Sequence, residues 1–305
     1  MVKRLGFLVI FFIAGCAVDK TSQKFSFPFN AISPAPAAPS GGAPGIEIQT
    51  SLDVTMAVLT SNLVFDGVRL LLPNTSSAGF PINNTVSFDY LSTSLSFQAN
   101  STTNYGSGTI YYGYNSPAPT AGQSALFWST SQNGNPGTLT IRDDSSGAVL
   151  SNTSITFSNN YGCGVIGPGG SNAPITFCNG NYYGVCTTNT GYIRFFSFDS
   201  SGTMQSAVTT TLDALTYHKL NALTCYNRNS LILVTDSNAY NAYNGFYKYD
   251  LSFNLIATDS NNSYSFPSNL QRIVGIATDG TYLYLQGSTN NGKYTLGKAT
   301  FGNLK

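Results

Sequence analysis

The chain has 305 residues, of which only 9% are charged, and its 14 Lys and Arg side chains nearly balance its 13 Asp and Glu. This length suffices for one large β domain or two ordinary domains. The balanced charge excludes an extended basic surface of the kind that binds nucleic acid or an anionic membrane. We therefore expect no nucleic-acid partner.

The first sixteen residues have the pattern of an export signal. Lys3 and Arg4 precede the apolar run Leu5–Ala14, which is too short to span a ~30 Å hydrocarbon core as a helix but suits a signal peptide. The run ends in Ile-Ala-Gly-Cys16, which resembles the lipobox of bacterial lipoproteins. The resemblance implies a signal peptide over residues 1–15 and a diacylated, palmitate-carrying Cys16 that anchors the protein to a membrane. The alternative is an ordinary secretory signal with an incidental cysteine.

The residue after Cys16 indicates in which membrane a lipoprotein is anchored. Asp in this place signals retention in the inner membrane of many Gram-negative bacteria, whereas this chain has Ala17. The resemblance therefore implies the outer membrane, on its periplasmic or its surface face. Residues 16–45 lack a periodic apolar pattern and are rich in Pro and Gly, which predicts an extended tether.

Residues 46–305 have the pattern of short strands and tight turns. One recurring feature is a strand that ends in an Asp-led turn, with Asp89, Asp144, Asp199 and Asp250 at spacings of 55, 55 and 51 residues. A second is a turn followed by a strongly apolar strand, such as Asp279-Gly280 before Tyr282–Leu285. Asp-Gly and Asn-Gly favour type I′ hairpin turns.

A period of about 52 residues with several strands per unit resembles a β-propeller blade. The predicted fold is therefore all-β, a propeller of about five units over residues 46–305. The alternative is two tandem β-sandwiches that divide near Asn159. The last unit lacks a strand after its final turn at Phe301-Gly302, whereas Ile46–Leu52 is an unattached strand. We expect these two ends to pair and close the ring, which removes an exposed edge.

Four cysteines follow Cys16, an even number in an exported chain, and all lie in the third and fourth units: Cys163, Cys178, Cys186 and Cys225. Two disulfides with three possible connectivities are the default expectation, and any bridge would join neighbouring units. The spacings lack the close cysteine pairs of structural zinc sites, so no metal is predicted there.

Groups that could support catalysis are scarce. His218 is the only histidine, and with nearby aspartates it is a weak candidate for a hydrolase or lyase site. The repeated aspartates are better explained as turn caps that accept backbone N–H bonds, with Ca²⁺ ligation near Asp143-Asp144 as the rival. No cofactor is expected, because Gly162–Gly167 matches a dinucleotide motif only by letter, with Pro168 where a helix should begin.

The loop at 236–245 is the sequence's best candidate for ligand binding. Its doubled Asn-Ala-Tyr presents Tyr240, Asn241, Tyr243 and Asn244, which combine amphipathic rings with amide donors. The alternative is a solvated hairpin loop whose tyrosines fold back on the sheet. We therefore interpret the chain as a lipid-anchored envelope or surface binding module with a protein or glycan ligand, with a propeller hydrolase or lyase and a structural envelope protein as alternatives.

Overall fold

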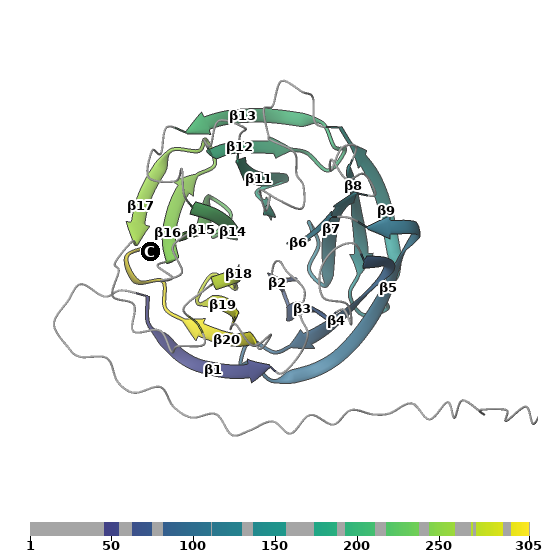
Figure 1. Ribbon diagram of the computed structural model, residues 1–305, viewed down its shortest axis with the longest axis horizontal. Coiled ribbons are helices and arrows are strands. Elements are labelled where there is room, and N and C mark those ends of the chain that lie inside the picture. Colours follow the sequence, from purple (N-terminus) through teal and green to yellow (C-terminus); the bar gives the residue numbers. More distant parts are fainter. Residues whose placement is uncertain are drawn as a thin grey trace, which may run out of the picture. The chain divides into compact units, whose positions relative to one another are not determined.

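The computed structural model describes residues 46–54, 63–74, 82–110, 112–129, 137–156, 174–187, 193–210, 218–237, 244–259, 270, 273–288 and 294–304. All belong to one compact unit, Ile32–Lys305. They form five four-stranded antiparallel sheets arranged around a central axis (Figure 1). Within these ranges no helix has the length and apolar character that a membrane span requires. The domain is a five-bladed β-propeller, so the expected fold is confirmed and the two-sandwich alternative is excluded.

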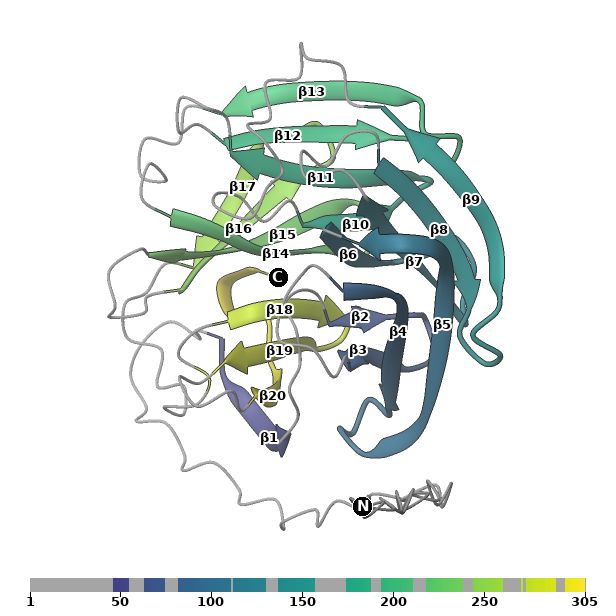
Figure 2. The same ribbon diagram turned by 45° about the vertical axis from the view of Figure 1, so that its right-hand side comes forward.

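Each blade has its first strand nearest the axis, as the turned view in Figure 2 also shows. The strands of blades 1 and 2 are β2 (Val64–Phe65), β3 (Leu70–Asn74), β4 (Ile82–Leu91) and β5 (Phe97–Ile110), then β6 (Tyr112–Pro117), β7 (Gln123–Ser129), β8 (Gly137–Asp143) and β9 (Val149–Ile155). Those of blades 3 and 4 are β10 (Ile175–Cys178), β11 (Asn181–Thr187), β12 (Ile193–Phe198) and β13 (Met204–Thr210), then β14 (His218–Tyr226), β15 (Ser230–Ser237), β16 (Asn244–Asp250) and β17 (Leu255–Asp259). Blade 5 contains β18 (Ile273–Thr278), β19 (Leu283–Ser288), β20 (Tyr294–Ala299) and β1 (Ile48–Val54), and the short 3₁₀ helix η4 (Gly302–Leu304) follows β20.

Blade 5 is built from both ends of the domain. Strand β1 pairs antiparallel with β20, with Leu52 opposite Leu296. Side chains reinforce the ladder, because the Thr295 hydroxyl donates to the Asp53 carboxylate at 2.7 Å. The predicted closure of the ring by the N-terminal strand is thereby confirmed, and it removes the free edge that an open blade would expose.

The apolar core lies between the blades. Five buried clusters can be distinguished, and each draws its residues from two neighbouring blades. In blades 2 and 3 an aromatic ring, that of Phe127 or Phe196, lies against a glycine of the neighbouring strand. A Cβ added at Gly184 would come within 2.2 Å of the Phe196 ring, its cross-strand partner. Close packing therefore requires both members of such a pair, the aromatic residue and the glycine.

Candidate functional site: the axial pocket

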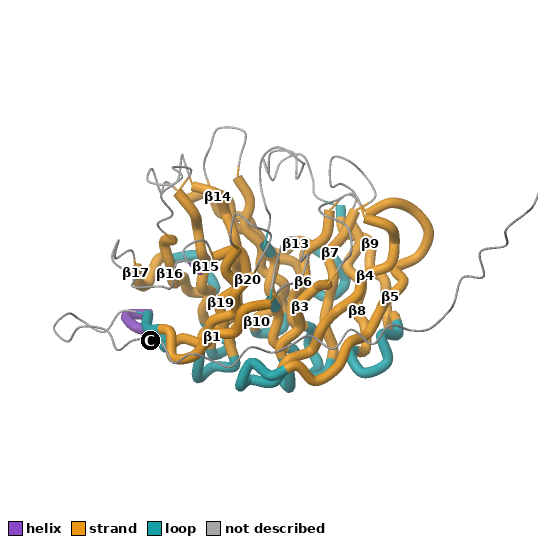
Figure 3. The backbone as a smooth tube through the Cα atoms, turned by 60° about the horizontal axis from the view of Figure 1, so that its bottom comes forward, coloured by secondary structure: helices purple, strands orange, loops and turns teal. Residues whose placement is uncertain are grey.

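The turns between the first and second strands of the five blades converge at one end of the axis. We call them the inner turns; they connect β2 to β3, β6 to β7, β10 to β11, β14 to β15 and β18 to β19. The described loops gather mainly along this face of the domain (Figure 3). Between the inner turns lies a cavity of about 640 Å³, which we call the axial pocket. Every blade contributes to its lining, which includes Phe65, Asp66, Pro117, Pro119, Phe177, Cys178, Asn179, Cys225, Asn227, Arg228 and Asp279.

Two carboxylates line the axial pocket, and both are engaged within their own turns. The Asp66 Oδ1 atom accepts the backbone N–H groups of Val68 at 2.8 Å and Arg69 at 2.6 Å. The Asp279 Oδ1 atom accepts those of Thr281 and Tyr282, both at 2.8 Å. Its Oδ2 atom accepts the Tyr284 hydroxyl at 2.7 Å. These bonds fix the turns and use acceptor sites that a general base would need.

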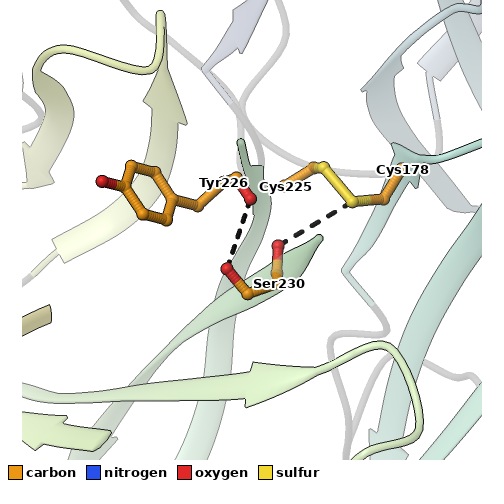
Figure 4. Close-up of a disulfide and its surroundings, with 4 residues drawn as sticks. All are labelled: Cys178, Cys225, Tyr226 and Ser230. Atoms are coloured by element: carbon orange, nitrogen blue, oxygen red, sulfur yellow. Dashed lines mark hydrogen bonds between the residues drawn. A yellow bond between two sulfur atoms is a disulfide. The ribbon is translucent and has the colours of Figure 1, made fainter. Parts of the chain in front are cut away.

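Two residues of the pocket lining, Cys178 and Cys225, form a disulfide, which Figure 4 shows. Cys178 ends the first strand of blade 3 and Cys225 lies in the first strand of blade 4, with their Cα atoms 5.4 Å apart. The bond joins neighbouring blades, as the sequence predicted. Cys186 is also disulfide-bonded. Cys163, the remaining cysteine of the two expected disulfides, lies outside the described residues.

A smaller cavity of about 30 Å³ lies directly below the axial pocket and shares Phe65, Pro117, Cys225 and Thr278 with its lining. Thr176 also lines it; this side chain is fully buried, and its hydroxyl has no hydrogen-bond partner. The space suffices for a very small number of water molecules. The two cavities thus adjoin each other through these shared residues.

A buried ionic cluster joins blade 1 to blade 2 next to the axial pocket. Arg142 is 1% exposed, and its Nη2 atom lies 2.9 Å from the Asp144 carboxylate. Its guanidinium also donates to Ser124 at 2.8 Å and Thr103 at 3.0 Å, and it stacks on the Phe88 ring at 3.4 Å from the centroid. The apolar cluster between these blades takes only Leu126 and the half-buried Trp128 from blade 2. Arg142 therefore occupies interblade space that apolar side chains fill elsewhere.

The cluster reaches the axial pocket through Asp66. Burial raises the pKa of Asp144 to about 7, and the neighbouring Asp66 carboxyl group adds to the increase, although Arg142 and Ser124 act in the opposite direction. The backbone continues the connection, because Gly122 N–H donates to the Asp66 carbonyl at 2.8 Å and Asp144 N–H donates to the Gly122 carbonyl at 3.0 Å. Asp66 in the pocket lining and the buried Asp144 are thus neighbouring acidic groups that the backbone also connects.

The capping role predicted for the four repeated aspartates is correct for two of them. Asp199 accepts the N–H groups of Ser201 and Thr203, and Asp250 accepts those of Ser252 and Asn254. For Asp144 the prediction is wrong, because its carboxylate is fully buried against Arg142.

In blade 2 the cap is instead Asp143, which accepts the N–H groups of Ser145 and Ser146. These bonds and the two serine hydroxyls lower its pKa to about 2. Asp89 lies within β4, three residues before the turn of blade 1, which begins at Ser92, whose hydroxyl accepts the Ser96 N–H. Asp143 and Asp144 thus have separate roles, and among the described residues no three Asp, Glu, His or Cys side chains are grouped to hold a metal ion.

The binding loop predicted from sequence is not part of the described structure. Tyr240, Asn241 and Tyr243 lie outside the described residues, and only the backbone of Asn244 is described, as the first residue of β16. The lipidation site Cys16 also lies outside them. His218 begins β14 opposite Ser237, and its side chain is not described. These assignments remain predictions.

No protein-family model matches the sequence, and no curated protein matches it. Solved structures share the fold. The β-1,2-mannobiose phosphorylase of Listeria innocua, solved with β-1,2-mannobiose, is 9% identical with a TM-score of 0.53, over 90% of this chain and 94% of that one. The catalytic domain of the Coprinopsis cinerea GH62 α-L-arabinofuranosidase is also 9% identical, with a TM-score of 0.48 over 88% and 95% of the two chains. At 9% identity the likeness to the phosphorylase shows the fold alone.

Proposed function

We propose that this protein is a lipid-anchored module of the bacterial cell envelope that binds a saccharide in the axial pocket. The observation that carries the proposal is the pocket itself. Its volume of about 640 Å³ lies in the range of small-molecule sites. Its lining combines the half-buried rings of Phe65 and Phe177 with the amides of Asn179 and Asn227 and the guanidinium of Arg228.

This lining suits a sugar because a pyranose ring has an apolar face and an edge of hydroxyl groups. Aromatic rings pack against the first, and amide or guanidinium groups donate to the second. The pocket walls come from five blades and include an interblade disulfide, so little side-chain or loop ordering remains to be done when a ligand binds. The Listeria phosphorylase, whose fold is similar, is named with a disaccharide, which makes β-1,2-mannobiose a suitable first probe.

The anchor is proposed from the lipobox resemblance at Cys16. Metabolic labelling with a palmitate analogue should label the wild-type protein and leave Cys16→Ser unlabelled and uncleaved. Equal labelling of both proteins would contradict the anchor without bearing on the pocket. Protease accessibility on intact cells would then assign the domain to the surface or the periplasmic face.

The binding proposal is tested on a saccharide array that includes β-1,2-mannobiose. The test variant is Asn179→Gly/Asn227→Gly, which removes two pocket amides while retaining residues that tolerate the positive φ angles of 46° and 50° found there. The matched control is Asn229→Ala, an exposed neighbour in the same turn that does not line the pocket. We expect the double variant to lose the wild-type hits and the control to retain them.

The loop predicted from sequence supplies a third arm of the same experiment. Tyr240→Ala/Tyr243→Ala would lose the hits if that loop holds the ligand, in which case the pocket assignment is wrong and the binding function stands. An array without any hit for the wild-type protein would contradict saccharide binding and favour a structural role in the envelope.

A propeller enzyme that acts on glycosidic bonds is the second candidate, favoured by the similarity to the Listeria phosphorylase. Glycoside hydrolysis usually needs two carboxyl groups on opposite sides of the bond. The two described pocket carboxylates, Asp66 and Asp279, are both held by turn amides. Turnover of any array hit by wild type, with loss in His218→Ala, would establish the enzyme; binding without turnover supports the module.

A further inference from the structure

The inner turn of blade 4 differs from the other four inner turns in the residue that occupies its left-handed backbone position. Each of those four turns has a glycine in the left-handed region, namely Gly67, Gly122, Gly180 and Gly280, with φ between 78° and 90°. The turn of blade 4 has no glycine. It places Asn227 at φ 50° and Arg228 at φ 60° between Tyr226 and Asn229, whose N–H donates to the Tyr226 carbonyl at 3.2 Å.

Arginine is an unfavourable choice for this conformation. The side chain of an L-residue crowds its own backbone at positive φ, whereas glycine adopts the region freely, and Asn tolerates it better than other residues. Non-glycine residues in such conformations are concentrated at functional sites, where the surroundings hold them in place. Glycine at 228 would fit the turn, so the arginine side chain itself needs an explanation.

The surroundings of Arg228 in the protein do not supply one. Its side chain is exposed at the rim of the axial pocket, and it forms neither of the two ion pairs found among the described residues. The carboxylates that line the same pocket already have partners. Asp66 is held by its turn amides and by Arg69, and Asp279 is held by its own turn and Tyr284. The pocket lining thus includes one cationic side chain, Arg228, and no carboxylate among the described residues forms an ion pair with it.

From this geometry we propose that Arg228 binds the carboxylate of an acidic saccharide, a uronic acid, in the axial pocket. This inference rests on the proposed function and narrows its ligand class. A guanidinium matches a carboxylate with two parallel N–H···O bonds, which an ammonium group cannot reproduce. Asp66 is buried and paired with Arg69, which limits the repulsion that an incoming carboxylate would meet on that side of the pocket. The sugar ring would rest on the apolar and amide groups of the lining.

The test compares three probes by protein-observed NMR titration: D-glucuronate, D-glucose and acetate. The wild-type protein should bind glucuronate at least tenfold more tightly than glucose or acetate. Arg228→Gly should lose that advantage while its melting temperature stays equal or rises, because glycine suits the turn. Arg228→Lys should show intermediate affinity, and Asn229→Ala should behave like wild type.

The outcomes separate the inference from the proposed function. Equal binding of glucose and glucuronate to the wild type, or unchanged glucuronate binding in Arg228→Gly, overturns the inference and leaves saccharide binding intact. A lower melting temperature of Arg228→Gly overturns it too, because Arg228 would then serve the fold. Acetate binding as tight as glucuronate contradicts a role for the sugar ring. Binding of none of the three probes overturns the inference, whereas saccharide binding itself is decided by the array.

Discussion

Removal of Arg142 should destabilise the junction of blades 1 and 2 more than a cavity of the same size would. Arg142→Ala leaves the Asp144 carboxylate buried without its guanidinium partner at 2.9 Å, and it leaves Ser124 and Thr103 without their donor. Breaking a buried pair by removing one member costs about 3–5 kcal/mol. For a domain of this size that corresponds to a decrease in melting temperature of roughly 6–20 °C.

The loss of stability caused by Arg142→Ala should increase as the pH rises. The pKa of Asp144 is raised to about 7 from an ordinary value of 3.8, mainly by burial. A raised pKa in the folded state gives stability that is complete below the unfolded pKa and is lost as the pH rises through about 7. Without Arg142 the charged form is less favourable still, so Arg142→Ala should lose more stability at pH 8 than at pH 5.

Two neighbouring residues provide matched controls for this pH dependence. Asp144→Asn removes the titrating group, so its stability should change less between pH 5 and pH 8 than that of the wild type. Asp143→Asn removes a turn cap whose pKa is lowered to about 2, so it should leave the dependence between pH 5 and pH 8 unchanged. A double change of Arg142 to Met and Asp144 to Leu should recover most of the loss, because apolar groups can replace a buried pair.

Urea unfolding followed by the fluorescence of Trp128 measures these effects. This is the only tryptophan of the chain, and it packs against the apolar cluster between blades 1 and 2. A cost of Arg142→Ala below about 1 kcal/mol at pH 8, well below that of an unpaired buried charge, would contradict this role of Arg142, as would an equal cost at pH 5 and pH 8.

Three further predictions concern the ring. Deleting residues 46–54 removes the outer strand of blade 5, so the domain should lose its cooperative melting transition, and an unchanged transition in calorimetry would contradict closure by β1. Gly184→Ala should cost about 1–3 kcal/mol by overpacking against Phe196, measured by urea unfolding, and Phe196→Leu in the same chain should recover part of it, whereas no recovery would point to a backbone effect. Cys178→Ser should cost about 4 kcal/mol from the 47-residue separation that the disulfide closes, and Cys225→Ser should reproduce that loss; a change below about 1 kcal/mol would show that interblade packing alone holds blades 3 and 4.

The repeat structure could be predicted from the sequence because strand alternation and turn residues recur with a regular period. Asp-Gly and Asn-Gly turns marked the inner hairpins, and the unpaired strand near Ile46 indicated ring closure. The prediction of which aspartates cap the turns was less accurate. Asp143 and Asp144 are adjacent, and the sequence does not tell which of the two carboxylates faces solvent. The structure assigns the cap to Asp143 and the buried pair to Asp144.

The axial pocket could not be predicted for a related reason. Its lining comes from five turns that are separated by about one repeat each, and no local motif connects them. The sequence does contain one usable signal, because the turn at 227–229 has Asn-Arg-Asn where other inner turns have glycine. Arg142 gave no such signal, since a single arginine in a strand of alternating residues is typical of a solvent-facing position.

Saccharide binding in the axial pocket is best tested by the saccharide array, read for wild type, Asn179→Gly/Asn227→Gly and Asn229→Ala together. We expect hits for the wild type and for Asn229→Ala and their loss in the double variant. Hits retained in all three proteins would contradict the axial pocket as the binding site, and the absence of any hit would contradict saccharide binding.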